Sequence, residues 1–195
     1  MVDLIYAVRG EAVPADYHAL LDAALRAALP WLEEEPLAGV HGLRTSPARD
    51  QIALLPRRAR LTLRLPEKCV VDARVLENRT LCLRDATLGL SAMRVKPLVA
   101  ADTIYADMVT LGASDEVEFS DLLQQALYAL DVRAWHICGR QRALLTHDGP
   151  AIGYPVVLHD LKPAASLHVQ RLGIGPGRRL GCGLFVPHKT ITGLD

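Results

Sequence analysis

A glycine- and arginine-rich run near the C-terminus is the part of this 195-residue chain best suited to chemistry with a phosphate. Five glycines lie within Gly173–Gly183, and Arg178 and Arg179 lie among them. Glycine lets backbone N–H groups approach a phosphate closely, and arginine adds a charged planar fork. The run lacks the Gly-Lys-Ser/Thr of a P-loop. It also follows an expected helix and leads into a strand, whereas a dinucleotide-binding fingerprint follows a strand and opens a helix. The alternative is a flexible connection between a helix and a strand.

Histidine supplies the candidate acid–base groups, because its unperturbed pKa of about 6.5 lets it exchange protons near neutrality. The seven are His18, His41, His136, His147, His159, His168 and His188. They show neither His-x-His nor His-Glu-x-x-His spacing, and the four cysteines form no Cys-x-x-Cys pair. The sequence therefore predicts no metal site and no cofactor.

The net charge is zero, but the charge is unevenly distributed. The segment 44–64 holds six arginines and one acid, 99–132 holds seven acids and no lysine or arginine, and 133–195 holds eight basic residues and three acids. Two basic segments could form one positive face for a polyanion such as RNA. Ordinary solvated surfaces of an arginine-rich protein are the alternative.

The composition excludes several classes of protein. Half of the residues are hydrophobic and 23% are charged, which is too apolar for a fully disordered chain. No window has the roughly 18 consecutive apolar residues of a transmembrane helix, and the start lacks the pattern of a secretion signal. We therefore expect a cytoplasmic protein with reduced thiols and no membrane partner.

The elements of the first half follow the order β-α-β-β-α-β. Asp3–Arg9 alternates as a strand, and Pro14 and Asp16 open a helix that we expect to end at Pro36. The remaining expected elements are strands at Val40–Arg44, at Gln51–Leu55 or Arg60–Leu65, and at Thr80–Arg84, a helix at Pro66–Leu76, and a connector or extra strand at Ala92–Leu98.

The same order recurs in the second half. The expected strands are Thr103–Leu111, Arg133–Gly139, Ile152–His159 and Gly181–Val186, and the expected helices are Asp115–Asp131, with Ser114 as N-cap, and Pro163–Leu172. The sequence thus predicts an α+β protein of two tandem ferredoxin-like (RRM-like) domains, residues 1–98 and 99–195.

The C-terminal run also resembles a known family. The glycines and arginines are followed by Gly181-Cys182-Gly183-Leu184-Phe185 and by Val186-Pro187-His188-Lys189. This signature is similar to that of a compact variant of the CRISPR repeat-RNA-processing endoribonucleases of the RAMP superfamily. Weaker similarities, such as Gly39-Val40-His41 and Arg60-Leu61-Thr62-Leu63-Arg64, extend the resemblance over nearly the whole chain.

The resemblance implies a function. Members of that family have two ferredoxin-like domains and cut the repeat portion of a precursor transcript without a metal. The ribose 2′-hydroxyl attacks its own phosphate, which leaves a 2′,3′-cyclic phosphate and a 5′-hydroxyl. Such a reaction needs a base, an acid, and cations or N–H donors at the phosphorane. We expect the enzyme to stay on its product and to join other subunits of a surveillance complex.

The resemblance also implies site residues. The family places its catalytic histidine on or just after the first helix, which makes His41 the first catalytic candidate and His18, with its neighbour Tyr17, the second. The expected RNA-binding residues are Arg57, Arg58, Arg60, Gly173, Gly175, Arg178, Arg179, Gly181, Gly183 and Lys189, the arginines at 57–60 on a stem and the others near the domain junction.

Two other functions stay open on the sequence. One is a non-catalytic subunit of the same fold that only binds the guide RNA. The other is an unrelated ferredoxin-like protein that binds a small phosphorylated ligand, since a fold alone does not decide function.

Overall fold

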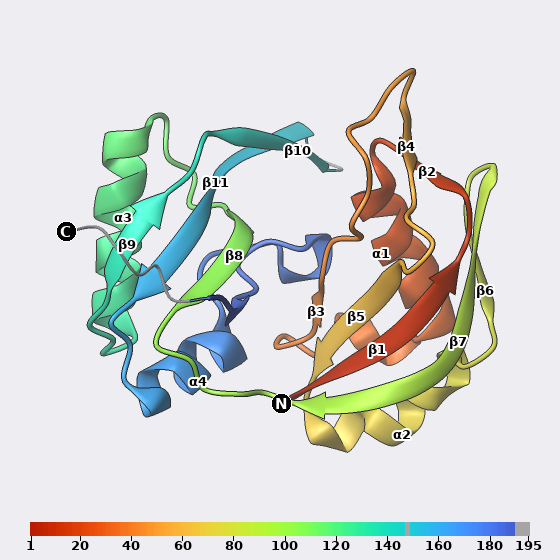
Figure 1. Cartoon of the computed structure of the whole chain (residues 1–195), viewed down its shortest axis with the longest axis horizontal. Helices are drawn as coiled ribbons and strands as arrows, with labels where there is room; N and C mark the ends of the chain where they lie inside the picture. The colour runs from red at the N-terminus through yellow and green to blue at the C-terminus, as the bar shows by residue number, and fades with distance from the viewer. Residues whose placement is uncertain (147–148, 190–195) are drawn as a thin grey trace. The chain divides into compact units, whose positions relative to one another are not determined.

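The computed structural model describes residues 1–146 and 149–189, so His147 lies outside the described residues. Contacts between Cα atoms divide the chain into two compact units. The first unit is Met1–Pro97 with Leu145–Asp148, and the second is Leu98–Leu144 with Gly149–Asp195. Each unit combines an antiparallel sheet with helices (Figure 1), which confirms the predicted α+β class.

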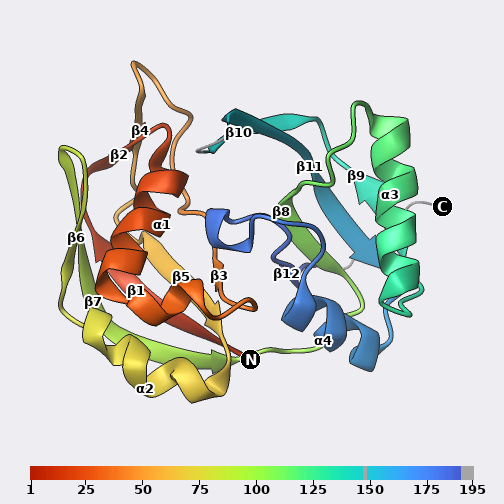
Figure 2. The same ribbon diagram turned by 180° about the vertical axis from the view of Figure 1, so that it is seen from behind.

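The first unit is built on a five-stranded antiparallel sheet in the order β3-β5-β1-β7-β6. Its strands are β1 (Val2–Arg9), β3 (Gly39–Val40), β5 (Arg60–Leu65), β6 (Thr80–Leu83) and β7 (Ala86–Pro97), and β2 (Ala12–Pro14) pairs separately with β4 (Ile52–Leu54). The helices α1 (Tyr17–Ala28) and α2 (Val70–Ala73) cover one face of the sheet, as Figures 1 and 2 show from opposite sides. Without β6, this strand order is that of a ferredoxin-like domain.

Strand β1 lies between β5 and β7, and its side chains alternate between the two faces of the sheet. Leu4, Tyr6 and Val8 point to the helices and are buried. The Tyr6 hydroxyl donates a hydrogen bond of 2.9 Å to the carbonyl of Ala73, the last residue of α2. Burying such side chains stabilises a fold by about 1.5–3 kcal/mol each. The face without helices, called the open face here, carries Asp3, Ile5, Ala7 and Arg9.

The fourth ferredoxin strand differs from the prediction. It is β7, which pairs with β1 along most of its length, whereas the expected Thr80–Arg84 strand is the edge strand β6. Arg84 has φ of +54°, and this turn folds β6 back onto β7 as a hairpin. The segment Ala92–Leu98, expected as a connector or an extra strand, is a strand and forms the last part of β7 up to Pro97.

One other prediction in this unit needs correction, and one alternative is decided. The first helix ends at Ala28, well before Pro36, because Leu29 precedes Pro30 and takes the extended φ, ψ of −132° and 77°. Of the alternatives Gln51–Leu55 and Arg60–Leu65, the second is the strand that pairs with β1, while Ile52–Leu54 pairs with β2 in a separate two-stranded sheet.

The second unit repeats the ferredoxin order in a sheet β10-β11-β8-β12, in which β9 also pairs with β11. Its strands are β8 (Ile104–Val109), β9 (Trp135–Cys138), β10 (Arg142–Thr146), β11 (Gly149–His159) and β12 (Val186–Pro187), and its helices are α3 (Glu116–Ala129) and α4 (Pro163–Leu172). Phe119, Leu123 and Leu127 of α3 are buried in its core with Val156 and Leu158 of β11. No helix in residues 1–146 and 149–189 is long and apolar enough to span a membrane.

The last strand is much shorter than expected. Up to Lys189, where the described residues end, only Val186–Pro187 pairs with β8, whereas the sequence predicts a strand at Gly181–Val186. Gly181 and Gly183 have φ of +91° and +67°, outside the β region, so the chain turns there.

The N-cap of α3 is Asp115 and not Ser114. The Asp115 carboxylate accepts a hydrogen bond of 2.9 Å from the Glu118 backbone N–H, while the Ser114 hydroxyl donates to the Glu118 side chain. Asp115, the residue after the predicted N-cap Ser114, therefore satisfies the Glu118 N–H group in the first turn.

This assignment predicts that Asp115→Ala lowers the free energy of unfolding by about 1 kcal/mol. Urea denaturation measures the loss. Ser114→Ala is the matched control and should cost less, because the Ser114 hydroxyl satisfies no backbone N–H of the helix. A larger loss for Ser114→Ala would contradict the assignment.

Candidate functional site

His41 follows β3 on the open face of the first sheet. Its backbone N–H donates to the Thr62 carbonyl at 2.9 Å, which continues the pairing of β3 with β5. Thr62 lies opposite Ile5 of β1, so His41 shares the open face with both. Its side chain is 18% exposed, and Nε2 lies 3.9 Å from Asp3 Oδ1. His41, the first catalytic candidate, thus has a half-buried imidazole beside the carboxylate of Asp3.

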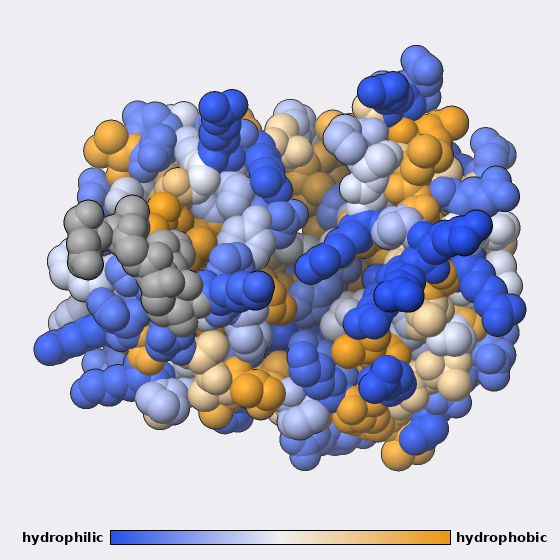
Figure 3. Space-filling model, in the orientation of Figure 1, coloured by the Kyte–Doolittle hydropathy of each residue, from blue (hydrophilic) through white to orange (hydrophobic). Residues whose placement is uncertain are grey.

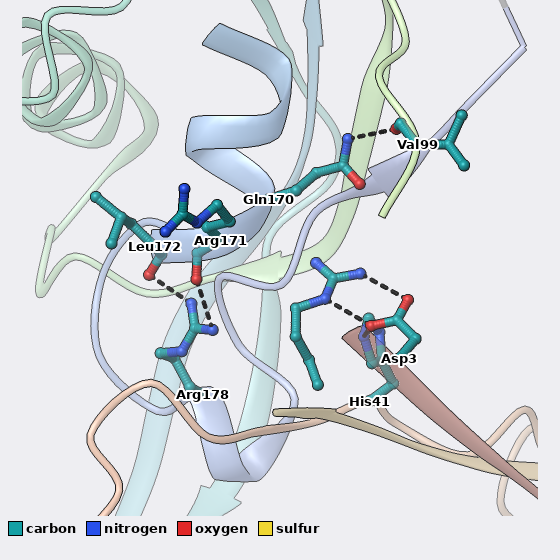
Figure 4. A network of polar contacts seen from close by, with 8 residues as sticks. Asp3, His41, Val99, Gln170, Arg171, Leu172 and Arg178 are labelled. Carbon is teal, nitrogen blue, oxygen red and sulfur yellow. Dashed lines mark hydrogen bonds and ion pairs between the residues drawn. The ribbon is translucent and has the colours of Figure 1, made fainter. Parts of the chain in front are cut away.

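The same Asp3 carboxylate binds Arg64 in a bidentate ion pair (Figure 4). Arg64 donates from Nε to Oδ1 at 2.7 Å and from Nη2 to Oδ2 at 3.0 Å. The Arg64 side chain is fully buried and that of Asp3 is 13% exposed. A bidentate pair fixes the plane of the carboxylate and therefore the direction it presents to His41.

Tyr17 and His18 form a second group at the start of α1. Their rings stack with centroids 4.0 Å apart. The Tyr17 ring is buried, and its hydroxyl donates to the Leu43 carbonyl at 3.1 Å. A Cβ at Gly42 would lie 3.3 Å from both Tyr17 Oη and His18 Cε1. Tyr17 and His18 therefore pack against the residues that directly follow His41.

The glycine-rich run of the second unit packs tightly against its own backbone and against β8. The N–H groups of Gly173, Gly181 and Gly183 donate to the carbonyls of Val169, Arg178 and Met108. These three N–H groups are therefore engaged within the unit, whereas the sequence analysis assigned them to RNA.

Steric contact explains the glycines of this run. Gly183 has φ of +67°, and a Cβ there would lie 2.2 Å from the Ile174 carbonyl oxygen. A Cβ at Gly175, with φ of +77°, would lie 2.3 Å from the Thr110 carbonyl oxygen. Only glycine allows both the positive φ and the close backbone approach.

Arg178 closes the C-terminal end of α4. Its guanidinium donates from Nη1 to the Leu172 carbonyl and from Nη2 to the Arg171 carbonyl at 3.2 Å (Figure 4). The last carbonyls of a helix lack intrahelical partners and carry partial negative charge, so a cation there is stabilising. The predicted RNA-binding residue Arg178 thus has a structural role at the helix end.

The other predicted RNA-binding residues lie on the surface of their units. Arg57 and Arg58 are exposed in the turn before β5, and Arg60 is the exposed first residue of that strand. In the second unit Arg179 is half-buried and Lys189 is exposed. The structure brings Arg60 onto the same sheet face as His41.

Three further cations on this face were not predicted from the sequence. Arg94 and Lys96 of β7 lie opposite Ile5 and Asp3, and Arg9 lies at the end of β1. The alternating run Ala92–Lys96 was the signal that could have found two of them, once the segment is known to be a strand.

Among the other described histidines, His159 also lies beside a carboxylate, with Nδ1 3.7 Å from Oδ2 of the exposed Asp160. The His136 ring lies 2.8 Å from the Ser120 hydroxyl of α3, and burial lowers its pKa. His168 and His188 are exposed. Within residues 1–146 and 149–189 no three His, Cys, Asp or Glu side chains are placed to hold a metal ion.

Comparison with known proteins identifies the family. A family model described as Cas6 Crispr matches residues 2–190. A CRISPR-associated endonuclease Cas6 of Myxococcus xanthus (strain DK1622) is 36% identical over 188 residues, which cover 95% of this chain and 81% of that protein. The chain belongs to the Cas6 family. The family makes it an endoribonuclease, as the sequence analysis predicted.

Solved structures confirm the ferredoxin-like fold of this Cas6 family member. A CRISPR associated protein Cas6 has a TM-score of 0.70 at 10% identity, with 96% of this chain and 99% of that chain covered. A Cas6-related protein from Pyrococcus furiosus has a TM-score of 0.62 at 11% identity, with 94% and 97% covered. A RAMP protein that binds different RNA substrates has a TM-score of 0.68 at 7% identity, with 97% and 100% covered.

The contacts of the glycine-rich run predict that Gly183→Ala destabilises the protein strongly. The new Cβ would overlap the Ile174 carbonyl oxygen, so the backbone must shift in addition to bearing the strain of a positive φ. Gly112→Ala is the matched control, because φ there is +74° but a Cβ would meet nothing within 4 Å. We expect about 1–2 kcal/mol for the control and more for Gly183→Ala, measured by urea denaturation. Equal losses would contradict the steric argument.

Proposed function

We propose that this protein cuts CRISPR repeat RNA in precursor transcripts to give guide RNAs, without a metal, and stays on its product within a surveillance complex. Its membership of the Cas6 family and its similarity to a Cas6 endonuclease support the substrate. A solved neighbour described as the CRISPR endoribonuclease Cse3 bound to a 19-nt RNA shares the fold, with a TM-score of 0.52 at 16% identity.

The observation that carries the mechanism is the position of His41. The imidazole is half-buried, lies on the open face of the first sheet and has the Asp3 carboxylate 3.9 Å from Nε2. A carboxylate beside a histidine favours its protonated form, so Asp3 would stabilise the imidazolium produced when His41 accepts a proton. Arg64 holds Asp3 in place for this role.

The chemistry proceeds by internal transfer. His41 accepts the proton of the ribose 2′-hydroxyl at the cut site, and the resulting oxygen forms a bond to the adjacent phosphorus. The bond from phosphorus to the 5′-oxygen breaks, and that oxygen takes up a proton from a general acid, so the proton removed by His41 is balanced by one supplied to the leaving group. The products are a 2′,3′-cyclic phosphate and a 5′-hydroxyl, and no water or metal enters the step. General base catalysis by one histidine contributes about 10²–10⁴-fold to such a rate.

Tyr17 supports this site in a positioning role. Because its hydroxyl donates to the Leu43 carbonyl, it anchors the segment that follows His41. His18 stacks on Tyr17 and packs against Gly42, so it is the second candidate for the proton transfer. The two histidines are thus held by the same small group of residues.

The test uses an RNA with the CRISPR repeat of the host's own array, pure protein and excess EDTA. We expect one cut, which a single 2′-deoxy substitution at the cut site abolishes. His41→Ala should lower the single-turnover cleavage rate by about 10²–10⁴-fold and leave RNA affinity within about 2-fold. His168→Ala, which removes an exposed histidine of α4, is the matched control and should cut at the normal rate.

Other outcomes would change the proposal. Full cleavage by His41→Ala with loss in His18→Ala would move the base to His18. A cut that the 2′-deoxy substitution does not block would exclude the internal transfer. Tight binding without any cut by the unmodified protein would favour the subunit that only binds guide RNA.

A further inference from the structure

The open face of the first sheet concentrates positive charge. The pairing of β1 with β5 and β7 brings five cations onto this face, and the strands that form it contribute one carboxylate, Asp3. The cations are Arg9, Arg60, Arg64, Arg94 and Lys96. Figure 3 shows long hydrophilic side chains gathered over β1, β5 and β7. A chain with zero net charge therefore has a strongly basic face.

Four of these cations are exposed and not neutralised. Arg64 is buried in its pair with Asp3, whereas Arg9, Arg60, Arg94 and Lys96 are exposed. Among the described residues, none of these four side chains makes an ion pair or a hydrogen bond. Three other exposed cations of this unit are paired instead: Lys68 with Glu35, Arg74 with Glu77 and Arg84 with Asp16.

The register gives the four cations a regular arrangement. Arg94 and Lys96 lie two residues apart on β7, which places them about 7 Å apart along the strand. Arg60 lies on β5, opposite Ala7 of β1. The side chains between them, such as Ile5, Ala7 and Thr62, are small or apolar, and none of the described residues on this face of β1, β5 and β7 is aromatic.

We propose that Arg9, Arg60, Arg94 and Lys96 form a phosphate-binding surface for the RNA backbone that leads to His41. This inference rests on the proposed function and adds three residues that the sequence analysis did not single out. Phosphates are the chemical groups that fit several unpaired cations on one face of a sheet without aromatic side chains. His41 belongs to the same row of the sheet as Thr62, Ile5 and Arg94, about 14 Å from Arg94 across three strand spacings.

Contacts to phosphates carry no sequence information, so the contribution of these cations to binding should not depend on the sequence of the RNA. Loss of these cations should weaken the binding of every RNA by the same factor.

The experiment compares the full-length protein with Arg60→Ala/Arg94→Ala/Lys96→Ala. The probes are the repeat RNA with a 2′-deoxy cut site and a polyuridine strand of equal length. Fluorescence anisotropy at several salt concentrations gives the dissociation constants. We expect the slope of log affinity against log salt to shrink by about 2, since each phosphate contact to a single strand contributes about 0.7. At 0.1 M salt we expect a loss of about 10-fold or more, equal for both probes.

The matched control is Lys68→Ala/Arg74→Ala/Arg84→Ala, which removes the same charge from positions whose cations are paired. It should leave the salt slope unchanged and the affinity within about 2-fold. Arg60→Gln/Arg94→Gln/Lys96→Gln keeps longer side chains and should reproduce the loss of the alanine variant, which separates charge from packing.

The two proposals fail in different ways. If the triple variant binds like its control, the phosphate surface is wrong, while the EDTA and His41→Ala results still stand. If only the repeat RNA loses affinity, the face binds a sequence or a structure and not phosphates, which also overturns the inference. If the unmodified protein neither binds nor cuts the repeat RNA, both proposals are overturned.

Discussion

Strand β1 imposes the constraint on which the first unit depends. Because it is paired on both sides, its side chains must alternate between the helices and the open face. Leu4, Tyr6 and Val8 are thereby committed to the core. Asp3, Ile5, Ala7 and Arg9 are left for the other face, where β5 and β7 add cations in the same register. A shift of one residue would exchange the core and the candidate site, so stability and function share one pairing.

The ion pair of Asp3 with Arg64 is the most demanding polar contact on that face. Removing a buried arginine from water costs several kcal/mol, which a bidentate pair with good geometry offsets. Such a pair contributes little net stability, but it leaves the carboxylate oxygen with one orientation. His41 lies 3.9 Å from that oxygen. The pair therefore links the sheet register to the environment of the proposed base, while the exposed cations nearby remain available to phosphates.

The glycine-rich run shows how one composition can serve two purposes. Glycines beside arginines fit a phosphate cradle, and they fit equally well a segment in which backbones approach closely. In this unit the second purpose accounts for Gly175 and Gly183, where a Cβ would meet a carbonyl oxygen at 2.3 and 2.2 Å. Arg178 is likewise engaged at the end of α4. The signature that resembles the family is thus largely a folding signature, and the exposed Lys189 and the half-buried Arg179 remain its candidates for RNA contact.

Local patterns in the sequence determined the fold class and most elements, and the resemblance to a family implied the candidate histidines. The strand Asp3–Arg9 and the helix Pro163–Leu172 follow from periodicity and breakers, which depend on neighbours in the chain. The tertiary structure decided which strands pair. It made β7 the partner of β1, placed Arg94 and Lys96 beside Arg60, and joined Asp3 to Arg64 across 61 positions of the chain. Strand pairing depends on contacts between residues far apart in sequence, so no local pattern could assign the open face or its charge.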